Sequence, residues 1–199
     1  MGDTWITDMR HFLDVIDPAK TAQAPLPALR LACHLGSIVE AVTAGWDDRG
    51  DLIPTVLSCR RRPGRSACKG FIGARLLVDG RIEWGCSSCD DNGVISGWKG
   101  TPWDFSSVVG LGFARGRDLA ELAVSRAEYD ALRRILTVDR EAERVVKAAR
   151  LGPEDDEVVI VAPGNWLDHL IEQVAAEANA TGSRKTEALL GKVLARAEW

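Results

Sequence analysis

The 199-residue sequence predicts an α+β protein with an N-terminal helix, a zinc-ribbon β-hairpin module and a C-terminal αβ half with two strand–helix units. Three observations predict this fold class. Apolar residues recur at helical spacing near the N-terminus, four cysteines flank a β-hairpin pattern, and a strand followed by a helix start then occurs twice. The expected regions are an N-terminal helical segment at 1–57, the zinc-ribbon module at 58–105 and a C-terminal α/β region at 106–199.

The composition is that of an ordinary globular protein, with 46% hydrophobic and 27% charged residues. The net charge of −4 excludes a basic protein that coats nucleic acid. No apolar run reaches the length of about 18 residues that a membrane span needs. The first 17 residues hold four aspartates and no basic n-region, so we expect no signal peptide and a soluble, cytoplasmic protein.

The N-terminal region contains one clear helix pattern. Pro27 suits the first turn, where its missing N–H costs nothing, and Gly45 suits the position just after the helix end. A short helix is expected around 9–15, and the apolar run 52–57 is typical of a strand. The residues of the expected apolar helix face are Leu31, Leu35, Ile38, Val39 and Val42.

Five cysteines are present, at positions 33, 59, 68, 86 and 89. An odd number without a secretion signal argues against a disulfide framework. Four of them form a C-x8-C pair and a C-x2-C pair, separated by 17 residues. Cys33 lies apart from these pairs on the expected helix, where we expect a lone buried thiol and not a fifth ligand.

The interval between the two cysteine pairs has the pattern of a β-hairpin. Residues 71–78 and 81–84 have strand character, and Asp79-Gly80 between them is typical of a type I′ turn. Such a hairpin brings the loops of the two pairs side by side. Zn²⁺ takes four thiolates in a tetrahedron at about 2.3 Å. The sequence therefore predicts a zinc ribbon whose ligands are Cys59, Cys68, Cys86 and Cys89.

Alternatives to this zinc site remain. The first pair spans eight residues, more than the usual two to four, although Pro63-Gly64 supplies a turn within the loop. A redox CxxC pair needs a following helix, whereas residues 94–98 have β character. Four unrelated buried cysteines are the other alternative. No His-x-Glu motif accompanies the second pair, which excludes the zinc-deaminase pattern.

Four cysteine ligands leave no open coordination position, so the expected zinc is structural. No Ser/His/Asp or Cys/His set is present, and no catalytic residue is assigned. His169 is expected on a solvated helix face. The sequence therefore offers no positive sign of an enzyme.

The C-terminal region contains two expected strand–helix units. Residues 119–124 are typical of a strand, and Ser125 with Glu128 forms a capping box that begins a helix. Residues 158–161 are the strongest strand pattern in the chain, and Asn165 is expected to cap the following helix. The other expected elements are a glycine-rich loop at 108–117, a helix at 139–151 and a last helix from Ser183 to Ala197.

The zinc-ribbon module is the one basic region of the chain, with eight basic and five acidic residues. Its cations cluster around the first cysteine pair. They suit contacts with phosphates, but the favoured interpretation is that they offset the −2 charge of a Zn(Cys)₄ centre and keep the loop solvated. The candidate nucleic-acid-binding residues are Arg60, Arg61, Arg62, Arg65 and Lys69.

Three tryptophans, Trp84, Trp98 and Trp103, lie within twenty residues of one another. Exposed tryptophans stack on bases, whereas buried ones would cover the thin sheet of a ribbon. Burial in the core is the favoured interpretation.

The stretches 59–65, 79–84, 92–98 and 100–104 resemble an uncharacterised family of small bacterial proteins, and 174–179 resembles it loosely. No activity is known for that family. The resemblance therefore implies only the zinc-ribbon fold.

Two functions of different class remain. The first is a non-enzymatic zinc-binding protein that acts as a regulator, binding nucleic acid weakly through the basic ribbon. The alternative is a protein-interaction adaptor whose zinc is purely structural and whose acidic helices contact the partner. Arginines that share an exposed face with Trp98 favour the first function. Arginines that pair with acidic residues of the helices favour the second.

Overall fold

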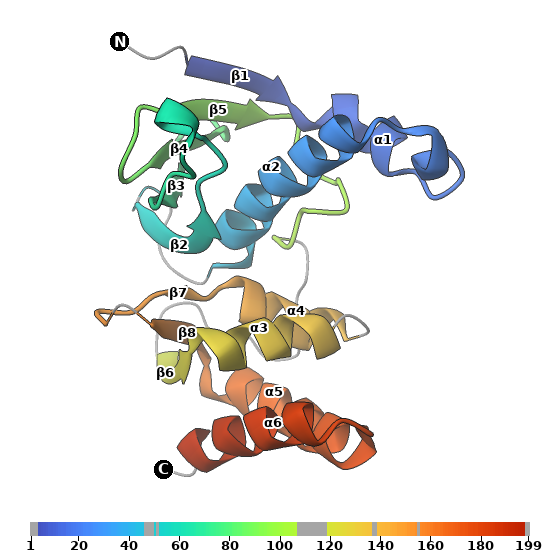
Figure 1. The fold of residues 1–199 in the computed structure, drawn as a ribbon, viewed down its shortest axis with the longest axis vertical. Coiled ribbons are helices and arrows are strands. Elements are labelled where there is room, and N and C mark those ends of the chain that lie inside the picture. Colours follow the sequence, from blue (N-terminus) through green and yellow to red (C-terminus); the bar gives the residue numbers. More distant parts are fainter. Residues whose placement is uncertain are drawn as a thin grey trace. The chain divides into compact units, whose positions relative to one another are not determined.

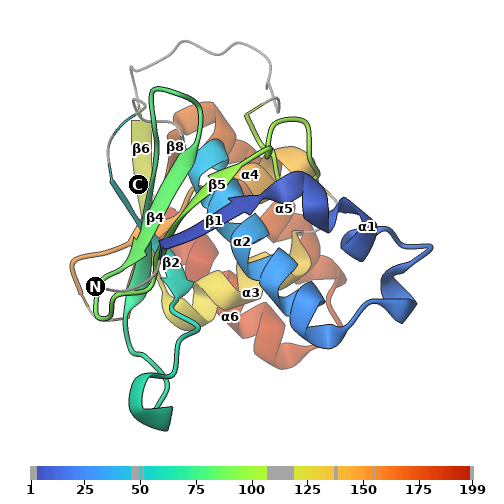
Figure 2. The same cartoon turned by 90° about the horizontal axis from the view of Figure 1, so that it is seen from above.

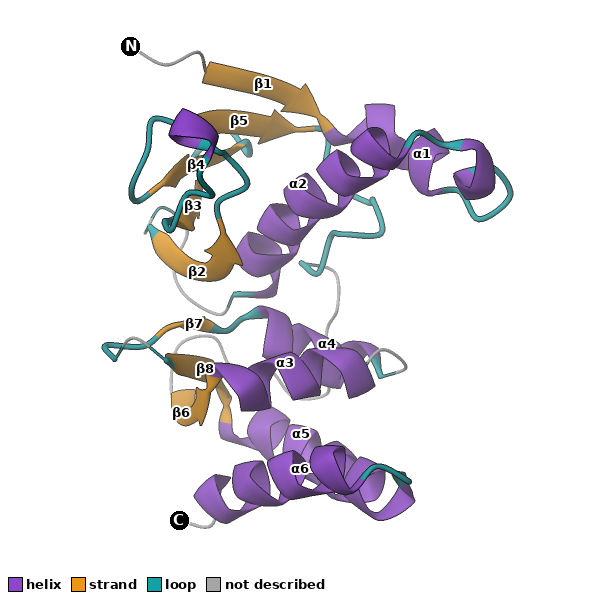
Figure 3. Ribbon diagram, in the orientation of Figure 1, coloured by secondary structure: helices purple, strands orange, loops and turns teal. Residues whose placement is uncertain are grey.

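The computed structural model describes residues 4–45, 50, 52–106, 119–136, 139–154 and 156–197. They form a mixed α/β structure that divides into two compact units (Figure 1, Figure 3). The N-terminal unit comprises residues 1–43 and 47–107, and the C-terminal unit comprises residues 44–46 and 108–199. The segment with the first long helix and the segment with the cysteine pairs thus belong to the same unit. The expected loop at 108–117 lies outside the described residues.

The strands of the N-terminal unit are β1 (Thr4–Asp8), β2 (Ile53–Ser58), β3 (Phe71–Leu76), β4 (Ile82–Cys86) and β5 (Asn92–Ser96). They lie side by side in the order β1-β5-β4-β3-β2. β1 pairs with β5 in parallel, and the other neighbours are antiparallel. The sequence does not predict β1, because its two large apolar residues, Trp5 and Ile6, are adjacent and do not alternate with polar ones.

Helix α2 (Leu26–Ala44) lies against one face of this sheet (Figure 1). It packs on Ile72, Ile82 and Ile95, which come from three different strands. Leu31, expected on the apolar face, is exposed instead. Three short segments precede the helix: η1 (Met9–Phe12), α1 (Leu13–Ile16) and η2 (Thr21–Gln23). The residues of α2 in the core are Ala32, Leu35, Ile38, Val39 and Val42.

Strands β3 and β4 form an antiparallel hairpin, but its turn is not the expected type I′ turn. Gly80 has a positive φ of 83°, whereas the φ of Asp79 is not positive. The Gly80 amide donates to the Leu77 carbonyl at 2.9 Å, and the Leu77 amide donates to the Arg81 carbonyl at 2.8 Å. This is the three-residue loop in which a glycine closes an ordinary turn with a bulge. The Asp79 carboxylate accepts the Arg81 amide, which stabilises the observed form.

The three neighbouring tryptophans are all buried, as favoured from the sequence. The indole of Trp98 donates to the Gly80 carbonyl at 2.9 Å and so ties the segment after β5 to the hairpin turn. Trp103 lies against Gly36 of α2, where an added Cβ would come within 2.2 Å of the indole nitrogen. These contacts make the tryptophans part of the core between α2 and the sheet.

The C-terminal unit contains a sheet with the strand order β7-β8-β6, in which both neighbouring pairs are antiparallel. Its strands are β6 (Leu119–Ser125), β7 (Arg150–Leu151) and β8 (Glu157–Pro163). Its helices are α3 (Arg126–Ile135), α4 (Arg140–Lys147), α5 (Gly164–Ala180) and α6 (Arg184–Ala197). The two strand–helix units are therefore β6–α3 and β8–α5.

The helix boundaries of the C-terminal unit agree only in part with the sequence. The capping box of Ser125 and Glu128 is present. Asn165 is not a cap, because α5 begins directly after Pro163 at the end of β8. The helix expected to reach residue 151 ends at Lys147, since the chain then enters β7. None of the described helices is long and apolar enough to cross a membrane.

Candidate metal centre and basic loop

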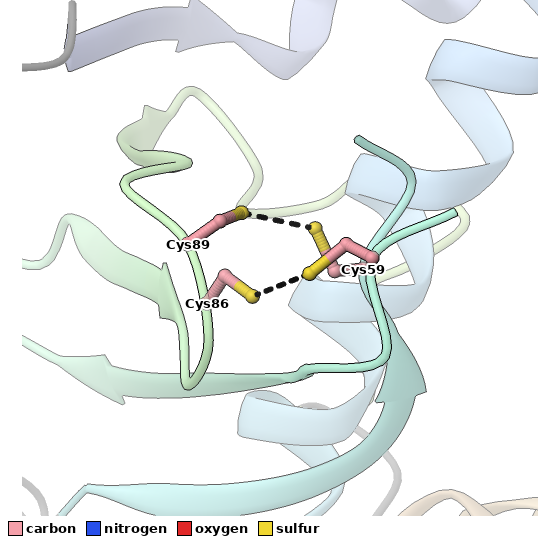
Figure 4. A group of neighbouring side chains, drawn as sticks. Cys59, Cys86 and Cys89 are labelled. Carbon is pink, nitrogen blue, oxygen red and sulfur yellow. Dashed lines mark hydrogen bonds between the residues drawn. The ribbon is translucent and has the colours of Figure 1, made fainter. Parts of the chain in front are cut away.

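The four clustered cysteines come from two loops that the β3–β4 hairpin brings together. Cys59 directly follows β2, and Cys68 lies shortly before β3. Cys86 is the last residue of β4, and Cys89 lies in the loop before β5. Cys86 is aligned with Ile72 in the hairpin, which places the start of β3 beside the end of β4. Figure 4 shows the sulfur atoms of the two loops facing one another.

The sulfur positions fit a tetrahedral metal site. All four sulfur atoms lie within 4.8 Å of one another. Cys59 Sγ is 3.7 Å from Cys89 Sγ, and Cys68 Sγ is 3.7 Å from Cys86 Sγ (Figure 4). A tetrahedron with metal–sulfur bonds of about 2.3 Å has edges of about 3.8 Å. The cysteines are not joined by disulfides. They could therefore hold a metal ion.

Backbone amides of the loops point at the cysteine sulfurs. The amide of Arg61 donates to Cys59 Sγ at 3.4 Å, and that of Gly70 donates to Cys68 Sγ at 3.4 Å. The amide of Ser88 donates to Cys86 Sγ at 3.3 Å. In each case the donor is two residues after the cysteine. The wide first loop thus presents its sulfurs in the same way as the narrow C-x2-C loop, and amide donors of this kind favour the thiolate form.

The space around the sulfurs leaves no room for a larger residue at Gly70. A Cβ at this position would lie 2.5 Å from Cys86 Sγ. The glycine therefore allows the chain before β3 to approach the second cysteine pair closely. Neither the amide donors nor this close approach follows from the cysteine spacing alone.

The thiols of the cluster differ in how readily they lose a proton. Burial raises the pKa of the Cys59 thiol. Burial also opposes ionisation of Cys86, but hydrogen bonds from the amides of Ser88 and Cys89, together with those from the thiols of Cys89 and Cys59, lower the pKa of that thiol. A divalent cation bound among the four sulfurs would displace the remaining protons.

Cys33 is not part of this cluster. It lies on α2 and is exposed, so the expectation of a buried thiol is wrong. The reason is its position on the helix, because the residues that α2 buries against the sheet start with Ala32 and Leu35 and leave Cys33 on another face.

The basic residues around the first cysteine pair are all exposed. Two of them have structural contacts. The Arg60 guanidinium donates to the Arg30 carbonyl of α2 at 2.9 Å. Arg61 Nε lies 3.6 Å from the carboxylate of Asp91, a buried residue in the second cysteine loop. These two arginines hold the first cysteine loop to its neighbours.

The other three cations, Arg62, Arg65 and Lys69, have no side-chain hydrogen bond or ion pair to any described residue. The segment from Arg60 to Lys69, here called the basic loop, contains no acidic residue. Arg65 has a positive φ of 70°, which no other described non-glycine residue has. In Figure 2 the short helical turn η3 (Pro63–Arg65) lies at the tip of this loop, extended away from the sheet.

The contacts of the arginines do not match either arrangement anticipated from the sequence. Trp98 is buried and shares no exposed face with the basic loop. The acidic partner of Arg61 is Asp91 of the second cysteine loop and not a residue of a helix. The sequence did not predict Asp91 as the partner of Arg61, because nothing in the spacing of the two residues links them.

His169 in the C-terminal unit has a partner that the sequence did not indicate. Its Nε2 lies 2.7 Å from a carboxylate oxygen of Asp139, and both side chains are partly buried. The other oxygen of Asp139 accepts amides at the start of α4. The contact therefore joins α5 to the N-terminus of α4.

No protein-family model, curated protein or solved structure matches the chain. The class of protein is thus defined by what the chain itself contains: a mixed α/β structure with a four-cysteine cluster compatible with a metal site. The resemblance to a family of small bacterial proteins stays a prediction.

Proposed function

We propose that this chain is a non-enzymatic zinc-binding protein in which a zinc-ribbon centre fixes a basic loop that binds nucleic acid. One observation carries the proposal. The four converging sulfurs include Cys59 and Cys68, which enclose four of the five cations of the exposed basic loop, and the fifth, Lys69, directly follows Cys68. The metal would therefore hold both ends of the segment that carries the positive charge.

Zinc is the proposed metal because of the ligand set. Four thiolates in a tetrahedron suit Zn²⁺, and four protein ligands leave no position for a substrate or a reactive water. The proposed role of the metal is therefore structural. No catalytic residue is assigned.

The distribution of charge favours attraction of a nucleic acid to the basic loop and not to the protein as a whole. Residues 58–105 carry a formal charge of +3 from eight basic and five acidic residues. A Zn(Cys)₄ centre would lower this to about +1, since the four thiolates outweigh the cation by two charges. A polyanion would thus meet positive charge mainly on the basic loop, and binding at physiological salt would be weak, at a Kd of roughly 10⁻⁴–10⁻⁶ M.

The test combines metal content with nucleic-acid binding on the full chain. Native mass spectrometry should find one zinc per chain in the wild type and in Cys33→Ser, and none in Cys86→Ser. Fluorescence anisotropy with labelled DNA and RNA should show binding by the zinc-loaded protein and its loss after chelation. A zinc-loaded chain that binds neither nucleic acid at low salt would overturn the proposal.

A protein-interaction adaptor with purely structural zinc is the second candidate. The observation that favours it is the outer strand β1, on which Trp5 is 50% exposed and Ile6 is 85% exposed. An edge strand with exposed apolar residues is a template for pairing with another chain. Full zinc loading without nucleic-acid binding would favour this candidate.

A further inference from the structure

We infer that the basic loop binds the sugar–phosphate backbone of a nucleic-acid duplex, independently of base sequence, through Arg62, Arg65 and Lys69. Arg60 and Arg61 build the loop and do not take part in binding. This inference rests on the proposed function and adds to it the class of nucleic acid and the residues that contact it.

The division among the five cations follows from their contacts. Arg60 is bound to the Arg30 carbonyl and Arg61 to the buried Asp91 carboxylate. For Arg62, Arg65 and Lys69 the structure has no carboxylate partner among the residues it describes. Three other exposed arginines of the same unit are paired with carboxylates: Arg10 with Asp8, Arg75 with Glu83 and Arg81 with Asp79. Arg30 is exposed and has no carboxylate partner among the described residues, but it lies on α2 and not in the basic loop. The three loop cations are thus available to phosphate oxygens.

The loop is held in one shape before any ligand arrives. The Cys68 amide donates to the Arg61 carbonyl at 2.9 Å and closes the base of the loop. The Arg65 amide donates to the Arg62 carbonyl at 3.1 Å, and Pro63 between them has a fixed φ. The positive φ of Arg65 is an unfavourable conformation that the surrounding turn imposes. A loop already ordered in this way loses little conformational entropy on binding.

The positions of the tryptophans favour contacts with the sugar–phosphate backbone of the nucleic acid over stacking on its bases. Proteins that bind single strands without sequence preference stack the bases on exposed aromatic side chains. Trp84, Trp98 and Trp103 are buried. The exposed Trp5 belongs to β1, at the opposite end of the strand order from β2 and β3, which the basic loop connects. A loop with free cations and no exposed tryptophan beside it, among the residues that the structure describes, suits contacts with phosphates, which carry no sequence information.

The number of phosphate contacts determines how steeply the affinity for a duplex falls with salt concentration. Each phosphate contact to a duplex contributes about −0.9 to the slope of log affinity against log salt concentration. Three contacts give a slope of about −2.7, or about a 40-fold loss of affinity between about 50 mM and about 200 mM salt. Five contacts would give a slope of about −4.5.

The experiment measures anisotropy of labelled DNA with the zinc-loaded full chain over a range of salt concentrations. The probes are two duplexes of about 20 base pairs with unrelated sequences and one of the component single strands, long enough to cover several phosphate contacts. We expect equal affinity for both duplexes, no tighter binding of the single strand, and a slope of about −2.7.

Two triple variants, each of which removes three positive charges, distinguish the effect of the loop cations from the effect of the net charge of the protein. Arg62→Gln/Arg65→Gln/Lys69→Gln should abolish duplex binding, while Arg10→Gln/Arg75→Gln/Arg81→Gln should keep the slope. Zinc content checks that both variants retain the metal site. If the wild type binds no nucleic acid, the proposed function fails. If it binds but prefers the single strand, or if the loop variant binds like the wild type, this inference alone is overturned.

Discussion

The carboxylate of Asp91 lies 3.8 Å from the sulfur of Cys59. Its other oxygen is 3.6 Å from Arg61 Nε, and Asp91 itself is only 6% exposed. When a bound zinc ion has displaced the proton of Cys59, the buried carboxylate lies beside a thiolate and needs a counter-charge, because the two anions repel each other. Arg61 supplies that charge at the edge of the candidate metal centre, where it is half exposed.

Replacing Arg61 by glutamine should therefore weaken zinc binding. Loss of an outer partner of a metal site costs about 10-fold or more in metal affinity. Competition with a chelating dye measures the change. Arg62→Gln removes the same charge from the neighbouring residue and should leave the affinity unchanged. Adding Asp91→Asn to the Arg61 variant should restore much of the loss, and a failure of this rescue would contradict the role given to Arg61.

Gly36→Ala should destabilise the N-terminal unit, although alanine normally favours a helix. The added Cβ would lie 2.2 Å from Trp103 Nε1, so the core must shift, at a cost of about 1–3 kcal/mol. Gly191→Ala in α6 is the matched control, since a Cβ there meets nothing within 4 Å. It should stabilise the protein by about 0.5–1 kcal/mol. Denaturant unfolding measures both values, and equal effects of the two substitutions would rule out the close contact.

Protonation of His34, on α2, should lower the stability of the N-terminal unit in mild acid. Burial, and secondarily the nearby Arg60, lowers the pKa of His34 to about 4. Its Nε2 is buried with no hydrogen-bond partner among the described residues, and its ring meets Trp84 edge-on. The neutral ring is therefore favoured in the folded protein. The stability from this group is complete above pH 6.5, the ordinary pKa, and is lost as the pH falls towards about 4.

The expected loss from His34 is about 2 kcal/mol, less than the full shift would give because the ring is partly exposed. Protonation of the cysteines also weakens a zinc site in acid, so the comparison must be between the wild type and His34→Gln. The unfolding free energy of the variant should fall less steeply between pH 6.5 and about 4. Parallel curves for the two proteins would exclude His34 as the cause.

The sequence predicted the parts of the fold that depend on local patterns. The apolar spacing located α2, and Ser125 with Glu128 located the start of α3. The strand patterns around Asp79-Gly80 implied that the two cysteine pairs converge, and their sulfurs do lie together. These features depend on residues that are close in the chain or joined by one short hairpin.

The features that the sequence did not predict depend on distant partners. β1 is a strand because it pairs with β5, and its own residues do not alternate. Trp103 is buried because Gly36, far away in the chain, leaves space for its indole. The contact of Arg61 with Asp91 exists only after the hairpin has formed. Asn165 was expected to be a cap from its residue type and from Asp168 three residues further on, but β8 continues up to Pro163 and leaves no cap position for it.

X-ray absorption at the zinc edge of the purified full chain shows whether the four clustered cysteines bind zinc. We expect one zinc ion per chain with four sulfur neighbours at about 2.3 Å. Cys33→Ser should give the same spectrum, because Cys33 lies outside the cluster. A chain without bound metal, or a zinc ion with nitrogen or oxygen atoms in place of any of the four sulfurs, would contradict it.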